Sequence, residues 1–385
     1  MRLCLVSLDI APVRSSGLAV YAERLAQRLA AAGHTITVIA ALRPGTGPVE
    51  RLGSVEVRRV PIGRSDWIGY SRRAARLVKR LDQANPFDVV HFVDLHFAWA
   101  YSGPFVVSLL QSFRQRGTAD HGRPYASSWR NRLFRIGYYS LARYLMEQPT
   151  LRRASACVSL SHATRDEFVD HYGLDPRRVT VIPEAIDSAR FAPRSTHELR
   201  KRLGLGDARV LVYIGFSTPR KGLEYLSAGL HLLPADVRLI IVGTWEPGYR
   251  SKVVAAAGSA WDRVIETGSV ADELIPAYLS LADVFVLPSL LEAMACGTPV
   301  VATSAGSIGE VVDGGGLLVP PGDTGALVAA ITRLLQDKAL RRQLSIAARE
   351  RAVSGFDAGK VVDEFERFYE AHRVTRTPQR VAEAT

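Results

Sequence analysis

The chain has 385 residues, and at about 100–200 residues per domain this length predicts two domains. A composition that is 47% hydrophobic and 23% charged excludes a disordered or low-complexity protein. The net charge of +11 lies in the first half, since residues 1–190 hold 27 basic and 16 acidic residues and residues 191–385 hold 22 of each. This asymmetry argues against a uniformly basic nucleic-acid-binding protein and predicts that the first half faces an anionic partner.

The cysteines and the hydropathy indicate a cytoplasmic protein. Cys4, Cys157 and Cys296 stand far apart, which gives no support to a disulfide scaffold or a zinc ribbon. No apolar stretch approaches the roughly 18 residues that would span a bilayer, and the N-terminus resembles a buried strand rather than a signal peptide. We therefore expect a cytoplasmic protein, and one that is peripheral if it meets a membrane.

The first half alternates short apolar runs with helical patterns. Such runs are typical of parallel strands that are buried on both faces. We predict strands at 3–8, 35–40, 55–62, 88–93, 104–110, 156–160 and 179–183. A helix over 17–32 between the first two strands completes a strand–helix–strand unit.

The second half repeats this alternation. We predict strands at 209–215, 237–243, 263–268, 284–288, 298–303 and 317–320, and helices at 222–233, 271–281, 323–336 and 338–352. A last amphipathic helix covers 357–372. The fold class is α/β, with two tandem Rossmann-like, doubly wound parallel-sheet domains, and such folds bind ligands beyond the carboxyl ends of the strands.

Several common motifs are absent. The first strand is not followed by GxGxxG, and no GxxxxGK[ST] occurs, which argues against standard dinucleotide and P-loop sites. The chain also lacks Asp-x-Asp, which would clamp a metal and a diphosphate, and GxSxG, which would mark a hydrolase.

The segment 281–323, LADVFVLPSLLEAMACGTPVVATSAGSIGEVVDGGGLLVPPGD, closely resembles the signature of glycosyltransferase family 4. The resemblance extends over nearly the whole chain, through 20–40, 181–187, 214–222 and 268–284. It implies the GT-B fold and a retaining, metal-independent transfer of sugar from a nucleotide diphosphate sugar, either a UDP-sugar or a GDP-sugar. It also implies an acceptor-side domain over 1–190 plus 357–385, to which the terminal helix returns, and a donor domain over 191–356.

The resemblance implies donor contacts at six positions: Gly17, Arg220, Lys221, Val270, Glu292 and Glu310. Lys221 follows a strand and a proline turn, where a cation would neutralise a diphosphate leaving group. The alternative for Arg220 and Lys221 is a solvated basic pair at the start of a helix.

Two of the donor positions lie where helices begin. Ser16 and Gly17 precede the first helix, whose backbone N–H groups would bind phosphate, although a simple turn with an N-cap would explain them equally. Glu310 has the alternative of a favourable carboxylate in the first turn of its helix.

The resemblance places His91, Asp94 and His96 in the acceptor cleft. The histidine that the family commonly has after the fifth strand is absent, and Gln111 and Arg114 line that strand end instead. The spacing H-x2-D-x-H also suggests a metal site, but alternation at a strand end points such side chains apart. We therefore predict no metal. The resemblance identifies no catalytic nucleophile.

The chain departs from the family pattern before Glu292. There the family has a Glu, a Gly-Phe-Gly-containing loop and a second Glu, whereas here Pro288-Ser289 continues directly through two leucines to Glu292. About eight residues are missing relative to that pattern, and Glu292 corresponds to the second Glu, which holds the ribose. Ser289-x-x-Glu292 is also a capping box, which is compatible with that role. In addition, Phe216 replaces the arginine that usually follows the strand before Lys221.

Residues 112–146 interleave arginines with aromatic residues. Over 128–146 the pattern is compatible with a basic amphipathic helix, which suits an anionic membrane surface or a lipid-linked acceptor. The alternative is a helix that packs its aromatic residues on the sheet and solvates its arginines. Single-stranded nucleic acid would use a similar composition, but the resemblance argues against it.

We therefore expect a retaining glycosyltransferase that moves a sugar from a nucleotide sugar to a carbohydrate or lipid-linked acceptor. The alternative is a catalytically impaired GT-B scaffold that binds nucleotide or partners after loss of the loop. A nucleotide-sugar epimerase would share the fold, and the 281–323 segment argues against it.

Overall fold

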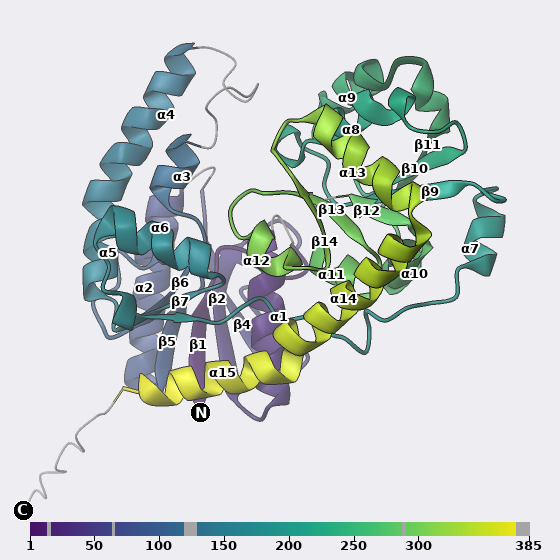
Figure 1. The fold of residues 1–385 in the computed structure, drawn as a ribbon. Coiled ribbons are helices and arrows are strands. Elements are labelled where there is room, and N and C mark those ends of the chain that lie inside the picture. Colours follow the sequence, from purple (N-terminus) through teal and green to yellow (C-terminus); the bar gives the residue numbers. More distant parts are fainter. Residues whose placement is uncertain (14–16, 64–65, 119–128, 287–289, 375–385) are drawn as a thin grey trace, which may run out of the picture. The chain divides into compact units, whose positions relative to one another are not determined.

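The computed structural model describes residues 1–13, 17–63, 66–118, 129–286 and 290–374. Apart from the stretch 119–128, the chain divides into two compact units (Figure 1). The first runs to Glu184 and resumes at Gly359, and the second covers Ala185–Ala358. The boundaries expected from the sequence, 190 and 356, lie a few residues away.

The first unit is built on a sheet whose described strands run in the order β3-β4-β2-β1-β5-β6-β7-β8. All neighbouring pairs are parallel except β3 with β4, which is an antiparallel edge pair that the sequence analysis missed. The strands are β1 (Arg2–Val6), β2 (Thr35–Leu42), β3 (Val49–Leu52), β4 (Val55–Pro61), β5 (Val89–Phe92), β6 (Val106–Leu109), β7 (Ala156–Ser159) and β8 (Val179–Val181).

The helices of the first unit lie between these strands in the sequence, except α15, which comes from the end of the chain. They are α1 (Gly17–Ala31), α2 (Trp67–Ala84), η1 (Leu95–Phe97), α3 (Phe113–Thr118), α4 (Trp129–Ala142), the π-helix η2 (Arg143–Glu147), α5 (Gln148–Arg153), α6 (His162–Tyr172), η3 (Pro176–Arg178) and α15 (Ala358–Ala371).

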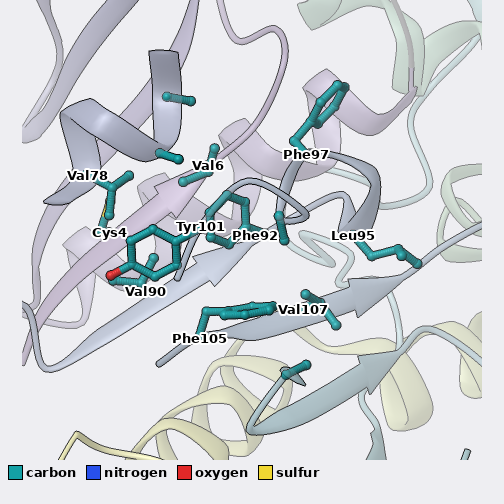
Figure 2. Close-up of a cluster of buried hydrophobic side chains, with 14 of the residues drawn as sticks. Cys4, Val6, Val78, Val90, Phe92, Leu95, Phe97, Tyr101, Phe105 and Val107 are labelled. Atoms are coloured by element: carbon teal, nitrogen blue, oxygen red, sulfur yellow. The ribbon is translucent and has the colours of Figure 1, made fainter. Parts of the chain in front are cut away.

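Aromatic side chains fill the core beneath β5 and β6. Phe92 packs against Tyr101 and Phe105, with ring centroids 5.5 and 5.6 Å apart (Figure 2). Cys4 and Val107 belong to the same cluster and are fully buried. Because these strands carry apolar side chains on both faces, polar groups concentrate at their ends.

The terminal helix α15 packs on the first unit, as predicted, and a buried histidine fixes it there. The Tyr369 hydroxyl lies 2.7 Å from Nδ1 of His91, and Nε2 of His91 lies 2.8 Å from the Ser108 hydroxyl. Burial lowers the pKa of His91 to about 3, so the ring is neutral. His91 is fully buried; its assignment to an acceptor surface is corrected, because both ring nitrogens are already occupied within the core.

The second unit contains a sheet whose described strands are all parallel, in the order β11-β10-β9-β12-β13-β14. The strands are β9 (Arg209–Ile214), β10 (Val237–Val242), β11 (Val264–Gly268), β12 (Val284–Val286), β13 (Val300–Thr303) and β14 (Gly316–Val319). Each lies within or beside the apolar run that predicted it.

Helices flank the second sheet, and two buried clusters fill the space between helices and strands. The helices are α7 (His197–Arg202), η4 (Pro219–Lys221), α8 (Leu223–Gly229), η5 (Leu230–Leu232), α9 (Tyr249–Ala257), η6 (Gly258–Arg263), η7 (Asp272–Leu274), α10 (Ile275–Leu281), α11 (Leu290–Ala295), α12 (Ile308–Val312), α13 (Thr324–Gln336) and α14 (Lys338–Phe356). In the part of the chain that the structure describes, no helix combines the length and apolarity needed to cross a bilayer.

We predict that Tyr369→Phe lowers the unfolding free energy of the first unit by about 1–3 kcal/mol, because it leaves Nδ1 of the buried His91 without its partner. Thermal denaturation and hydrogen exchange of α15 measure the effect. Tyr144→Phe is the matched control, since the Tyr144 side chain is exposed. Equal stability of Tyr369→Phe and the wild type would show that the hydrogen bond does not hold α15.

Candidate active site

The second sheet brings most of the expected donor residues to one edge. Parallel strands end at the same edge, so the residues that directly follow them meet there. Arg220 and Lys221 follow β9, Val270 follows β11, Glu292 follows β12, and Glu310 follows β13. These residues come from four different strands and lie at one edge of a single unit.

Lys221 is the residue of this edge whose ionisation is most perturbed. It ends the short helix η4 and is partly buried, whereas its neighbour Arg220 is exposed. Burial, with a smaller contribution from the charge of Arg220, lowers the pKa of Lys221 to about 8. A partly desolvated ammonium group interacts strongly with an anion that replaces its lost hydration.

The backbone around Lys221 is held by the segment that follows β10. The Ser217 amide donates to the Thr244 carbonyl at 2.8 Å, and the Glu246 amide donates to the Ser217 carbonyl at 2.9 Å. This close approach requires glycine at 243, where φ is +128° and a Cβ would lie 2.2 Å from the carbonyl oxygen of Gly215. Backbone hydrogen bonding between the segments of β9 and β10 therefore continues past the strand ends, just before the turn that carries Lys221.

Tyr249 binds the residues that directly follow the Lys221 turn. Its ring is buried at the start of α9, and its hydroxyl donates to the Glu224 carboxylate and accepts from the Glu224 amide at 3.2 Å. Burial and the Glu224 carboxylate both raise the pKa of Tyr249, which keeps the hydroxyl protonated. Glu224 is three residues after Lys221, so Tyr249 fixes the start of α8. Sequence reasoning missed Tyr249, because a single tyrosine beyond a strand carries no distinctive spacing.

The remaining donor candidates of the second unit are partly buried. Val270 packs against one of the two cores, and Glu292 lies in the first turn of α11. Glu310 occupies the first turn of α12, and its carbonyl accepts a 2.7 Å hydrogen bond from Arg351. The Ser289 cap expected for Glu292 lies outside the described residues, as do Leu287 and Pro288 at the shortened loop.

Gly17 begins α1 in the first unit, and Ser16 lies outside the described residues. Gly17 is exposed, and a Cβ there would meet nothing within 4 Å, so the fold itself does not require glycine. The segment after β1 is tethered by the buried Arg59, which donates to the Ala11 carbonyl at 2.6 Å and to Glu50 at 3.0 Å. Sequence reasoning did not single out Arg59, since a lone basic residue in a strand has no motif.

Asp94 and His96 belong to a buried ionic group beyond the end of β5. His96 lies between two carboxylates, with Nδ1 2.6 Å from Asp94 and Nε2 3.1 Å from Glu147. Burial opposes the charge of His96, but Asp94 and Glu147 outweigh it and raise the pKa of His96. Burial likewise opposes the charge of Asp94, but His96 and Arg116 lower its pKa to about 2. The structure therefore brings Asp94 and His96 together, and it adds Glu147, which the sequence analysis missed.

The other two acceptor-side candidates follow β6. Gln111 is partly buried just before α3. Arg114 is the second residue of α3, and its guanidinium lies 3.0 and 3.2 Å from the two oxygens of Glu167. Within the described ranges, no cluster of three or more histidine, cysteine, aspartate or glutamate side chains has the arrangement that would hold a metal ion.

Comparison with known proteins connects these features to a family. The family model "Glycosyltransferase Family 4" matches residues 15–190, and "Glycosyl transferases group 1" matches residues 208–337. D-inositol 3-phosphate glycosyltransferase of Geodermatophilus obscurus is 29% identical, over 93% of this chain and 85% of that protein.

Solved structures show the same fold. Sucrose-phosphate synthase from Thermosynechococcus elongatus superposes with a TM-score of 0.79 at 22% identity, covering 96% of this chain and 98% of that one. The Anabaena protein HepE, solved in complex with UDP and glucose, has a TM-score of 0.70 at 20% identity, covering 96% and 100%. With one family model on each of its two parallel-sheet α/β domains, the chain is a family-4-like glycosyltransferase of the GT-B fold.

Proposed function

We propose that this glycosyltransferase transfers a sugar from a UDP-sugar or GDP-sugar to a carbohydrate or lipid-linked acceptor, with retention of configuration and without a metal. The observation that carries the proposal is the partly buried Lys221 at the carboxyl edge of the second sheet. The second unit would be the donor domain and the first unit the acceptor-side domain. UDP in the HepE complex supports a uridine nucleotide as the first to test.

The proposed roles follow the positions that match the family. Lys221 and Arg220 would stabilise the charge of the departing diphosphate, and this is the main electrostatic demand of the reaction. Glu292 would hold the ribose, and Val270, which lies in a matching position beyond β11, would contact the nucleotide. Gly17 and Glu310 would frame the donor.

In the first unit, we propose that the polar groups nearest to the acceptor are Asp94, His96, Gln111 and Arg114. Asp94 and His96 are buried and already paired, so the pair would hold the segment after β5 in place beside the acceptor. The basic excess of residues 1–190 supports an anionic acceptor or an anionic membrane surface as the partner of this unit. The protein would meet such a membrane on its cytoplasmic face.

We predict that Lys221→Met weakens UDP and GDP binding by about tenfold to a hundredfold, the range expected for losing one charge-assisted hydrogen bond. In the wild type, affinity should fall as the pH rises through about 8, because the neutral amine no longer attracts the diphosphate. Titration calorimetry at a series of pH values measures both effects.

Lys338→Met is the matched control for this charge loss, because Lys338 is an exposed lysine of the same unit. It should leave both the affinity and its pH dependence unchanged. A flat affinity between about pH 7 and 9 in the wild type would contradict the assignment of Lys221.

We further predict that Tyr249→Phe weakens diphosphate binding through Lys221, because it releases the start of α8. The effects of Lys221→Met and Tyr249→Phe should then be clearly non-additive in a double-mutant cycle on UDP affinity. Tyr278→Phe changes a buried tyrosine of the other cluster of this unit and serves as control. Additive effects would show that Tyr249 supports only the stability of the unit.

The shortened loop before Glu292 bears on turnover rather than on nucleotide binding. We predict that inserting a Glu-Gly-Phe-Gly-containing loop before Leu291 raises the rate of nucleotide release from donor sugars, while UDP and GDP affinities change little. Chromatography of released nucleotide measures the rate. An unchanged rate with a proven donor–acceptor pair would show that the short loop does not limit this enzyme.

A further inference from the structure

The outer face of α4 and η2 in the first unit carries large apolar side chains that nothing in the described structure covers. Four of them are more than half exposed: Leu133 at 60%, Leu141 at 59%, Tyr144 at 60% and Leu145 at 66%. We call these four residues the α4 face. Exposed apolar residues scattered singly are ordinary, but a contiguous group usually marks an interaction site.

The four residues share one side of the helix. Position 141 comes about two turns after position 133, and positions 144 and 145 come about one turn after 141. Their side chains therefore lie in a row along the helix. Gly137, one turn after Leu133, is exposed in the same row. The row therefore continues from α4 into the π-helix η2.

The opposite side of the same helix makes the packing contacts. Tyr139 packs against Phe113 of α3 with ring centroids 5.7 Å apart, and Ala142 is buried (Figure 1 shows α4 along the outside of the first unit). The Tyr138 ring, at the edge of the α4 face, packs edge-on against Trp67, with ring centroids 6.5 Å apart. Tyr139 thus packs inward, as one interpretation of the sequence expected for the aromatic residues, but the leucines and Tyr144 are exposed.

A buried carboxylate prevents the helix from rolling to cover this face. Glu147, the last residue of η2, lies 3.1 Å from Nε2 of His96 and accepts from the Phe113 amide at 2.9 Å and from the Tyr172 hydroxyl. Rolling the helix inward would expose Glu147 and leave the imidazole of His96 with one carboxylate fewer. The α4 face is therefore held outward by the same ionic group that lies beyond β5.

The segment that carries the α4 face is strongly basic in sequence. Residues 129–153 contain six arginines and one carboxylate, and that carboxylate is the buried Glu147. The arginines are Arg130, Arg132, Arg135, Arg143, Arg152 and Arg153. Two of them also hold the unit together, since Arg143 donates to the His171 carbonyl and Arg153 to the carbonyls of Trp99 and Tyr101. An exposed apolar row within a segment of single-sign positive charge has the chemistry of a helix that lies in the interface of an anionic bilayer.

We infer that the α4 face docks the first unit onto an anionic lipid surface, with Leu133, Leu141, Tyr144 and Leu145 inserted among the headgroups and the net positive charge of residues 129–153 attracted by the lipid phosphates. The inference rests on the proposed function only in that it names the surface at which a lipid-linked acceptor is met. A second copy of the chain is a poorer occupant, because two copies of this net positive segment would repel each other.

Co-sedimentation of the full chain with vesicles of equal parts phosphatidylglycerol and phosphatidylcholine tests the inference. Binding is expected at low salt, with a loss on raising the salt or on using phosphatidylcholine alone. The neutral double variant Leu141→Ser/Leu145→Ser should reduce partitioning at least tenfold, while UDP and GDP affinities measured by calorimetry stay at the wild-type value.

Leu232→Ser/Leu274→Ser is the matched control, since both leucines are exposed in the second unit. It should bind vesicles as the wild type does. Absence of vesicle binding at low salt, or equal binding by the two double variants, would overturn the inference. So would a dimer, seen by sedimentation velocity without lipid, that only Leu141→Ser/Leu145→Ser dissociates while its vesicle binding persists. None of these outcomes bears on nucleotide binding, so a failure of the proposed function would be seen separately.

Discussion

The parallel alignment of the second sheet is the constraint on which the candidate site depends. Six neighbouring strands end at one edge, so residues far apart in sequence, such as Lys221 and Glu310, reach the same edge without any specific contact between them. The central strands are largely apolar and buried. Arg220, Lys221, Glu292 and Glu310 lie beyond the carboxyl ends of the strands, where a phosphorylated ligand would find them.

Partial burial of the Lys221 ammonium group distinguishes this edge of the sheet from an edge lined only by solvated polar side chains. Lys221 is not a freely solvated lysine, because a glycine-dependent backbone ladder beyond β9 and β10 and the hydroxyl of Tyr249 hold its turn against the unit. The cost of desolvating the amine appears as its lowered pKa. A diphosphate would restore the lost interaction, which is the physical basis for assigning the donor to this unit.

Sequence periodicity was sufficient for most of the fold, because doubly buried strands produce short apolar runs that few other structures produce. It missed β3, whose residues alternate between partly buried and exposed and form an edge pair. For the site, a motif predicted Lys221 and Glu292. Tyr249, Arg59 and Glu147 could not be predicted, because each acts through a contact between segments distant in the chain.

His91 shows that a residue can fit a polar motif and still belong to the core. It stands three residues before Asp94 in a polar cluster, yet it lies within β5 and its ring is enclosed by Ser108 and Tyr369. Asp94 and His96 follow the strand and reach its end. The difference is set by where the strand terminates, at Phe92, and strand ends are what sequence patterns determine least well.

The same ionic group links two features of the first unit. Glu147 supports His96 beyond β5 and also fixes the orientation of the helix that presents the α4 face. Residues 129–153, with six arginines and one carboxylate, carry part of the basic excess of the first half, and the exposed apolar row lies in this segment. In this account the nucleotide is bound by the nearly neutral second half and the anionic surface by the first.

A crystal structure of the chain with UDP or GDP bound tests the central claim most directly. We expect density for the diphosphate within hydrogen-bonding distance of Nζ of Lys221 and for the ribose beside the Glu292 carboxylate. A nucleotide bound away from the carboxyl edge of the second sheet, with Lys221 making no contact to phosphate, would contradict it.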